Sequence, residues 1–128
     1  MTAGQAAGGA ALLQRQHKLT RRAEFDRVFS SSCRSRDACF VVLAKRNNKD
    51  YARLGMVVSA RALPLAVGRN RLKRLIREGF RQRQQQLAGL DIVVMAQKNI
   101  AKINNEGIQA SLSKHWEKTV RCKDSSSA

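Results

Sequence analysis

Apolar side chains near the start of the chain recur at the spacing of a helix. Phe25, Val28 and Phe29 stand at positions i, i+3 and i+4, and Thr20 precedes them where a first helical turn needs a capping oxygen. This pattern predicts a short amphipathic helix that begins after Thr20 and packs one face against a core.

Two compact runs of apolar, β-branched residues follow, at residues 40–43 and 54–58. Such runs favour strands over helices. A polar turn at residues 47–50 separates them, so we expect the two strands to pair as antiparallel neighbours. The pattern leaves open a further short strand at residues 33–36.

The second half of the chain predicts a long helix at residues 69–83, a strand at residues 91–96 and a last helix at residues 104–120. The strand is almost continuously apolar, as expected for one buried on both faces. The last helix has one apolar face, which includes Trp116, so we expect this side chain in the core. The order helix, strands, helix, strand, helix predicts an α+β sandwich in which helices pack against a mixed sheet.

The length of 128 residues suits a single folded domain, which we place at residues 17–121. Residues 1–16 are rich in Gly, Ala and Gln, and residues 122–128 end in a run of serine. Because neither segment can bury enough apolar surface to offset the entropy of ordering it, we expect a disordered N-terminal extension and a disordered C-terminal tail. No Lys or Arg precedes the first small-residue stretch, so we expect no secretory signal and a cytoplasmic location.

The charge of the chain indicates the class of its partner. The sequence has 25 Lys and Arg residues against 9 Asp and Glu, a formal net charge of +16. A compact domain with this excess repels itself, so the excess indicates a polyanionic partner, either nucleic acid or an anionic membrane surface. The membrane is the weaker alternative, because no apolar run approaches the roughly 20 residues that span a bilayer.

The cysteines and histidines do not form a recognisable metal or catalytic site. Cys33, Cys39 and Cys122 have neither a zinc-binding spacing nor an even number for disulfide pairing, and His17 and His115 lie far apart in the sequence. We expect free thiols in a reducing cytoplasm. No pair of carboxylates and no nucleophile with a base is evident, so we expect no catalytic residue and no metal or cofactor held by the protein itself.

The long helix separates apolar from basic side chains. Its apolar stripe consists of Leu72, Leu75, Ile76, Gly79 and Phe80. At 100° per residue, six polar side chains fall on an arc of roughly 140° on the opposite side, with Arg71 at its flank. These residues, which we call the basic arc, are Arg69, Asn70, Arg71, Lys73, Arg74, Arg77 and Arg81.

The basic arc has the composition of a phosphate-binding surface. Cations four residues apart on a helix repel one another, and a solvated surface helix normally interleaves both signs. Here Glu78 is the single acid nearby, and we expect it to orient Arg74 or Arg81. Guanidinium groups bind phosphate through paired hydrogen bonds, which explains a preference for Arg over Lys. A merely solvated charge run remains the alternative.

The predicted strands favour RNA over DNA as the partner of this helix. A helix that reads the DNA major groove usually belongs to a compact all-helical domain. A basic helix beside a sheet instead suits RNA bound through its shape and backbone, with a neighbouring groove for single-stranded nucleotides.

Residues 66–81, AVGRNRLKRLIREGFR, together with residues 53–55 and Ser59, resemble the signature of the bacterial ribonuclease P protein family. The resemblance implies the α+β fold of that family, which also occurs in a ribosomal protein domain. It further implies a subunit of an endoribonuclease that removes the 5′ leader from precursor tRNA. In that enzyme a large catalytic RNA performs the hydrolysis with Mg²⁺ and the small protein assists. The implied partners are the catalytic RNA and the 5′ leader of precursor tRNA, with neither DNA nor a membrane.

The resemblance also assigns roles to individual residues. The basic arc, with Arg61 in the turn before it, would contact the catalytic RNA or organise the metal ions of its active site. The leader cleft would be formed by Phe25, Phe29, Phe40 and Arg53. For each Phe, packing in the core is the alternative, because stacking and buried aromatic residues look alike in a sequence.

Two segments depart from the family pattern. Residues 60–65, ARALPL, replace a stretch that usually carries Lys-Lys or Gly-Lys, so Arg61 keeps one cation while Pro64 is added. Leu43 occupies a strand position that is often aromatic in the family. Two other hypotheses remain open: a ribosomal or other scaffold protein that grips folded RNA through the same helix, and an autonomous nuclease. The scattered carboxylates argue against the nuclease.

Overall fold

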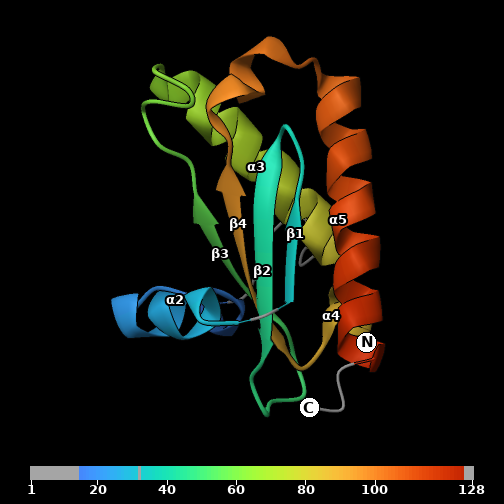
Figure 1. The fold of residues 1–128 in the computed structure, drawn as a ribbon. Helices are drawn as coiled ribbons and strands as arrows, with labels where there is room; N and C mark the ends of the chain where they lie inside the picture. Colours follow the sequence, from blue (N-terminus) through green and yellow to red (C-terminus); the bar gives the residue numbers. More distant parts are fainter. Residues whose placement is uncertain (1–14, 32, 126–128) are drawn as a thin grey trace.

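The computed structural model describes residues 15–31 and 33–125 (Figure 1). A helix, a run of strands, a helical segment, a strand and a last helix follow one another along the chain, as expected for the predicted α+β fold. The elements in order are η2 (Arg15–His17), α2 (Arg22–Phe29), β1 (Cys33–Arg36), β2 (Phe40–Arg46), β3 (Arg53–Val57), α3 (Ala66–Gln82), α4 (Gln84–Leu87), β4 (Leu90–Ala96), η3 (Lys98–Lys102) and α5 (Asn105–Ser125).

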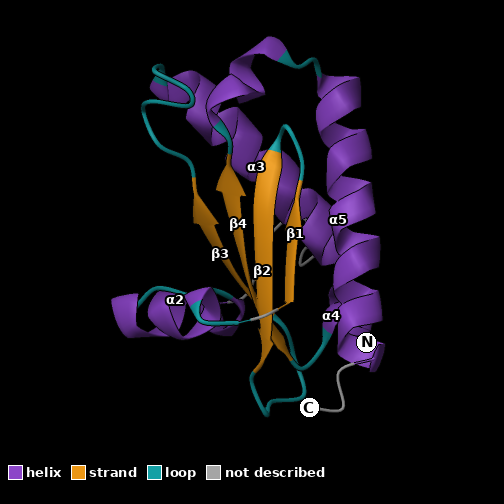
Figure 2. Cartoon of the chain, viewed as in Figure 1, coloured by secondary structure: helices purple, strands orange, loops and turns teal. Residues whose placement is uncertain are grey.

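The four strands form one mixed sheet in the order β1-β2-β4-β3 (Figure 2). The expected antiparallel pairing of residues 40–43 with residues 54–58 is wrong. Instead, β2 pairs antiparallel with β1 and β4, and β3 pairs parallel with β4. Strand β4 lies inside the sheet, with β2 on one edge and β3 on the other. Residues 90–94 of β4 are all buried, as expected for such a position. The short strand at residues 33–36, which the sequence left open, is present as β1.

Helices α3 and α5 cover one face of the sheet and enclose the larger core (Figure 1). The predicted apolar stripe of α3 is confirmed, since Leu72, Ile76 and Phe80 are buried. Phe80 meets Trp116 of α5 edge to face, with ring centroids 6.3 Å apart. A Cβ at Gly79 would lie 2.7 Å from the Trp116 indole nitrogen, so the two helices come this close because the position is glycine. This packing turns the basic side of α3 away from the sheet.

Helix α2 covers one end of the opposite face of the sheet (Figure 1). Val28 is fully buried there and packs with Leu19, Leu43 and Val93 in a second, smaller core. Phe25 lies at the edge of this cluster. The sheet is therefore covered completely on one face and only in part on the other.

The first turn of α2 receives its cap from inside the helix. The helix begins after Arg21, so the expected Thr20 cap is wrong. Glu24 Oε1 accepts hydrogen bonds from the backbone N–H groups of Arg21 and Thr20, each 3.1 Å long. The bond from Arg21 contributes most to lowering the pKa of Glu24, although burial opposes the shift. A carboxylate one turn into the helix thus satisfies the free donors at its start.

Both boundaries of the expected domain differ in the structure. Helix α5 continues to Ser125, so the end that we placed at residue 121 falls inside a helix. At the other end, η2 includes Arg15 and Gln16, which we assigned to the extension. Residues 1–14 and 126–128, the rest of the expected extension and tail, lie outside the described residues. No helix within residues 15–31 and 33–125 is long and apolar enough to cross a membrane.

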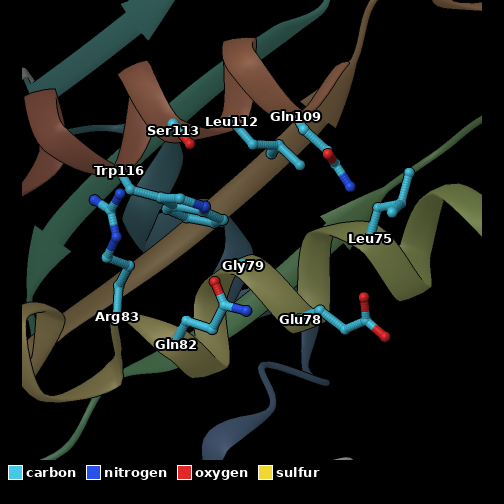
Figure 3. A pocket seen from close by; sticks show the side chains of 9 residues that line it. All are labelled: Leu75, Glu78, Gly79, Gln82, Arg83, Gln109, Leu112, Ser113 and Trp116. Atoms are coloured by element: carbon cyan, nitrogen blue, oxygen red, sulfur yellow. The ribbon is translucent and has the colours of Figure 1, made fainter. Parts of the chain in front are cut away.

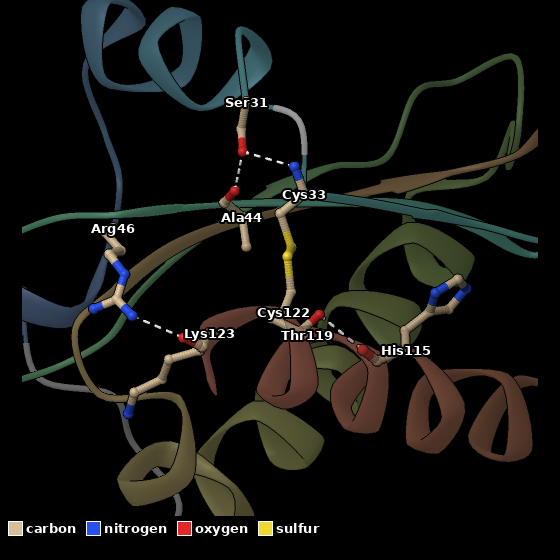
Figure 4. The surroundings of a disulfide bond; sticks show 8 residues. All are labelled: Ser31, Cys33, Ala44, Arg46, His115, Thr119, Cys122 and Lys123. Atoms are coloured by element: carbon tan, nitrogen blue, oxygen red, sulfur yellow. Dashed lines mark hydrogen bonds between the residues drawn. A yellow bond between two sulfur atoms is a disulfide. The ribbon is translucent and has the colours of Figure 1, made fainter. Parts of the chain in front are cut away.

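Cys33 of β1 and Cys122 of α5 form a disulfide, with their Cα atoms 6.2 Å apart (Figure 4). The expectation of free thiols is therefore wrong for Cys33 and Cys122. It is correct for Cys39, which is a buried free cysteine. The two partners are 89 residues apart in sequence, and no spacing rule connects them. Nearby, Arg46 of β2 donates a hydrogen bond of 2.7 Å to the carbonyl of Lys123. The end of α5 is therefore tied to the sheet edge.

Candidate RNA interface

Apart from Arg69, the basic arc lies along the side of α3 that faces away from the sheet. Asn70, Arg71 and Arg74 are exposed, and the other members of the arc are half-buried. In the described part of the chain, no carboxylate lies within 4.0 Å of a cation of the arc, because the ion pairs formed by the acids join other elements. The positive charge of α3 therefore stays available to an external anion.

Glu78 does not orient Arg74 or Arg81 as expected. Its side chain is exposed, and no basic group among the described residues lies within ion-pair distance of its carboxylate. An exposed pair gains little free energy in water, and Arg placed four residues before Glu has the less favourable orientation along a helix.

The side chain of Arg69 binds the turn before α3 and does not extend along the basic arc. Its Nη1 donates hydrogen bonds of 2.8 and 2.9 Å to the carbonyl oxygens of Leu63 and Pro64. At 100° per residue Arg69 lies beside Phe80 on the helix, so our placement of it opposite the apolar stripe is wrong. Arg61 is exposed in the same turn. Arg69 thus holds the backbone of the turn that presents Arg61.

Arg53, which the resemblance assigned to the leader cleft, is committed to a buried network. Its Nε and Nη2 donate to the two oxygens of Asp91 at 2.8 and 2.7 Å, and its Nη1 donates to Glu24 at 2.9 Å. Arg27 and Asn47 also donate to Asp91, at 2.7 and 2.9 Å. Burial alone would raise the pKa of Asp91, but these bonds, led by those from Arg53, lower it. The network fastens α2 to the sheet.

The three phenylalanines of the expected leader cleft have different surroundings. Phe40 is fully buried beside His115, so the core alternative is correct for this residue and the leader contact is wrong. Phe25 is half-buried, and a Cβ on Gly55 would lie 2.6 Å from its ring. Phe29 is 38% exposed at the end of α2. Phe29, and in part Phe25, can therefore meet a ligand beside α2.

A row of side chains crosses the sheet on the face that α2 covers only in part. The register pairs Arg36 with Val41, Val41 with Met95, and Met95 with Val57. Arg36 is exposed, Val57 is 39% exposed, and the other two are half-buried. We call these four residues the open row. Sequence reasoning missed the row, because strand alternation identifies its members only once the strand order and register are known.

A buried polar cluster joins β1 to α5. Ser35 Oγ lies 2.6 Å from His115 Nδ1, and His115 Nε2 lies 3.1 Å from Asp37 Oδ1. Ser111 donates a hydrogen bond of 2.6 Å to Asp37 Oδ2. Burial would raise the pKa of Asp37, but the hydrogen bonds, led by that from Ser111, lower it to about 2. His115 is 1% exposed, so a substrate cannot reach its ring. The described residues include no group of three His, Cys, Asp or Glu side chains that could hold a metal ion.

Comparison with known proteins identifies what this chain is similar to. A sequence profile of the family described as Ribonuclease P matches residues 13–120. The ribonuclease P protein component of Methylococcus capsulatus (strain Bath) is 45% identical over 114 residues, which cover 88% of this chain and 89% of the relative. That of Thioalkalivibrio sulfidiphilus is 41% identical over 102 residues, covering 80% and 85%.

Solved structures give the same result for the fold. The Staphylococcus aureus RNase P protein superposes with a TM-score of 0.73 at 30% identity, covering 79% of this chain and 93% of that protein. The RNase P protein from Thermotoga maritima superposes with a TM-score of 0.66 at 31% identity, covering 81% and 96%.

Proposed function

Since the chain belongs to the ribonuclease P protein family, we propose that it binds the catalytic RNA of this enzyme and the 5′ leader of precursor tRNA. In this role it assists the endonucleolytic cut that gives the mature 5′ end of the tRNA. The hydrolysis takes place on the RNA subunit with Mg²⁺, and the protein holds no cofactor of its own. The ribonucleoprotein works in the cytoplasm.

The observation that supports RNA binding most strongly is the basic arc without acidic partners. Arg71, Lys73, Arg74, Arg77 and Arg81 project from one helix, and no carboxylate of the described residues neutralises them. With Arg61 they supply six cations for phosphates. At 0.7 to 0.9 counterions released per contact, the logarithm of the binding constant falls with the logarithm of salt concentration at a slope of about −4 to −5.

We place the leader on the open row beside α2. Val41, Met95 and Val57 offer an apolar floor on which unstacked bases can lie, and Arg36 at the edge of the sheet can meet a phosphate. Phe29, 38% exposed, stands at the end of α2 as an aromatic surface for stacking. A single strand is thus bound by apolar contact and charge together, with little demand on base identity.

The surroundings of His115 favour an assisting role over catalysis by the protein. Ser35, His115 and Asp37 resemble a nucleophile with its base and an orienting acid, but Ser35 and His115 are enclosed between β1 and α5. A phosphodiester cannot approach a hydroxyl that is 8% exposed beside a histidine that is 1% exposed. Cleavage of precursor tRNA by the protein without RNA would overturn the proposal.

The arc is tested by salt-dependent binding to the cognate catalytic RNA. We expect Arg74→Ala with Arg77→Ala to make the log–log slope shallower by about 1.4 to 1.8, since two phosphate contacts are lost. Lys118→Ala, which removes an exposed cation from α5, is the matched control and should leave the slope unchanged. A slope near zero in the unmodified protein would refute the role of the arc.

Binding of the leader to the open row is tested by comparing precursor tRNA with mature tRNA, which has no leader. We expect Arg36→Glu and Val57→Glu to weaken binding of the precursor to the reconstituted ribonucleoprotein about fivefold or more, and to spare mature tRNA. Lys118→Glu supplies the same charge reversal away from the open row. A protein that serves as a scaffold for folded RNA would treat both tRNAs alike, and that result would contradict leader binding.

A further inference from the structure

A pocket of about 270 Å³ lies between α3 and α5, outside both surfaces described above (Figure 3). Glu78, Gln82 and Arg83 line it from the side of α3, and Gln109 and Ser113 line it from α5. Gly79 and Trp116 also line it, and they meet where the two helices approach each other. The walls are therefore mostly polar, whereas the helix contact beneath them is apolar.

The indole N–H of Trp116 has no hydrogen-bond partner although the side chain is 1% exposed. A buried donor without an acceptor costs free energy, and native proteins rarely leave one unpaired. The nitrogen faces Gly79, which has no side chain to cover it, and a Cβ at that position would lie 2.7 Å away. The Trp116 edge therefore forms the inner wall of the pocket behind Gly79, and its nitrogen is itself buried.

The side-chain amides at the rim are also free of partners. Within the described residues, neither Gln82 nor Gln109 makes a side-chain hydrogen bond, and the Glu78 carboxylate forms no ion pair. Primary amides offer a donor and an acceptor side by side, and this arrangement matches the edge of a nucleobase. A carboxylate complements the amino and imino hydrogens of bases.

The pocket is continuous with charged surface on two sides. Glu78 and Gln82 follow Arg74 at intervals of four residues, so the rim borders the basic arc along α3. On the other side Gln82 and Arg83 also line a second hollow that reaches Arg121 of α5. A polynucleotide lying on the arc would thus pass the mouth of the pocket, with cations on either side for its phosphates.

We propose that the pocket between α3 and α5 takes one unpaired nucleobase from the RNA that lies on the basic arc. The base enters edge first towards Trp116, and the amides of Gln82 and Gln109 together with Glu78 bind its polar edge. Arg83 pairs with the adjoining phosphate. The inference rests on the proposed RNA binding and adds to it a contact that reads a base instead of the backbone.

The single tryptophan of the chain makes the pocket directly observable. We would titrate the full-length ¹⁵N-labelled protein with each of the four nucleoside 5′-monophosphates and follow the one indole N–H resonance by NMR. At least one nucleotide should shift this resonance and two side-chain amide pairs. Ribose 5-phosphate, which has no base, should not. An unmoved indole signal, or equal shifts with ribose 5-phosphate, would overturn the proposal while leaving the arc untouched.

A pair of variants separates this contact from the electrostatic one. Gln82→Ala with Gln109→Ala should weaken binding of the cognate catalytic RNA about tenfold without changing the salt slope, because amides release no counterions. Gln85→Ala, an exposed glutamine that does not line this pocket, is the control. Binding within twofold of the unmodified protein would overturn the base contact alone. A salt slope near zero in every protein would overturn the arc and the base contact together.

Discussion

Replacing Asp91 by Asn tests the network that fastens α2 to the sheet. The variant keeps the shape of the side chain and removes its charge. The Asp91 side chain is 0% exposed and the Arg53 side chain is 14% exposed, so this pair is shielded from water. Removing one partner of such a pair typically costs 3 to 5 kcal/mol, since a buried charge is left unmatched. The Arg27 side chain is 39% exposed, so solvent screens its ion pair with Asp91, and we leave this pair out of the expected loss of stability.

We therefore expect a loss of about 3 kcal/mol for Asp91→Asn, near the lower end of that range because Asn still accepts one hydrogen bond. For a domain of this size the loss corresponds to a fall in Tm of roughly 10 to 15 °C. Urea unfolding followed by circular dichroism gives the free energy directly. The control is Asp26→Asn, since the Asp26 side chain is 61% exposed and its partner Arg22 lies 3.9 Å away at 94% exposure. This control should show no measurable loss.

The pH dependence gives an independent check. The pKa of Asp91 is lowered from its ordinary value of 3.8, because the hydrogen bonds from Arg53, Asn47 and Arg27 outweigh the effect of burial. The ionised Asp91 therefore contributes its full stabilisation at pH values above 3.8, the ordinary pKa of the unfolded chain. This stabilisation is lost as the pH falls through the lower pKa of Asp91 in the folded protein. The difference between the two proteins should shrink in acid. Equal stability at neutral pH, or a gap that persists unchanged into acid, would refute the reasoning.

Three further predictions concern other contacts. Arg69→Ala should lower the free energy of unfolding in urea by about 1 kcal/mol, because the carbonyl oxygens of Leu63 and Pro64 lose a donor. Arg74→Ala should leave this free energy unchanged, and equal effects of the two substitutions would contradict the placement of Arg69 against the turn. Asp37 has a pKa of about 2, below its ordinary 3.8, so its stabilisation should fade as the pH drops from 3.8 towards 2, and a Tm series on Asp37→Asn should lack that part of the decline. Reducing the Cys33–Cys122 disulfide opens an 89-residue loop and should cost about 4.6 kcal/mol in a chain-entropy estimate. Cys33→Ser should show the same urea midpoint with and without reductant.

Periodicity located the helices and strands but could not order them. The buried run in β4 predicts a strand with neighbours on both sides, yet nothing in residues 40–43 or 54–58 says that β4 separates them. The same limit applies to the Cys33–Cys122 pair, because its closeness depends on how α5 packs beside β1. Local pattern therefore predicts elements, while long-range neighbours depend on the packing of all of them together.

The candidate interface was predictable where charge alone defines it. The cationic side of α3 follows from the helical period, and the buried stripe opposite confirms that side. Arg69 and Phe40 were misplaced for different reasons. A long side chain at a helix start can fold back onto the preceding turn, as Arg69 does, and a run that is apolar on both faces does not reveal which face Phe40 takes. Arg53 was assigned to the leader, but its guanidinium binds the buried Asp91 and the partly exposed Glu24.

The last strand along the chain occupies the middle of the sheet, and this has a consequence for the newly made polypeptide. During translation β1 and β2 can pair as soon as they leave the ribosome. Until residues 90–96 emerge, the described residues offer β3 only the single bridge between Leu54 and Lys18. Until then the edges of β2 and β3 are open to strands of other chains. We therefore expect a polypeptide truncated before residue 90 to aggregate instead of folding as a smaller stable protein.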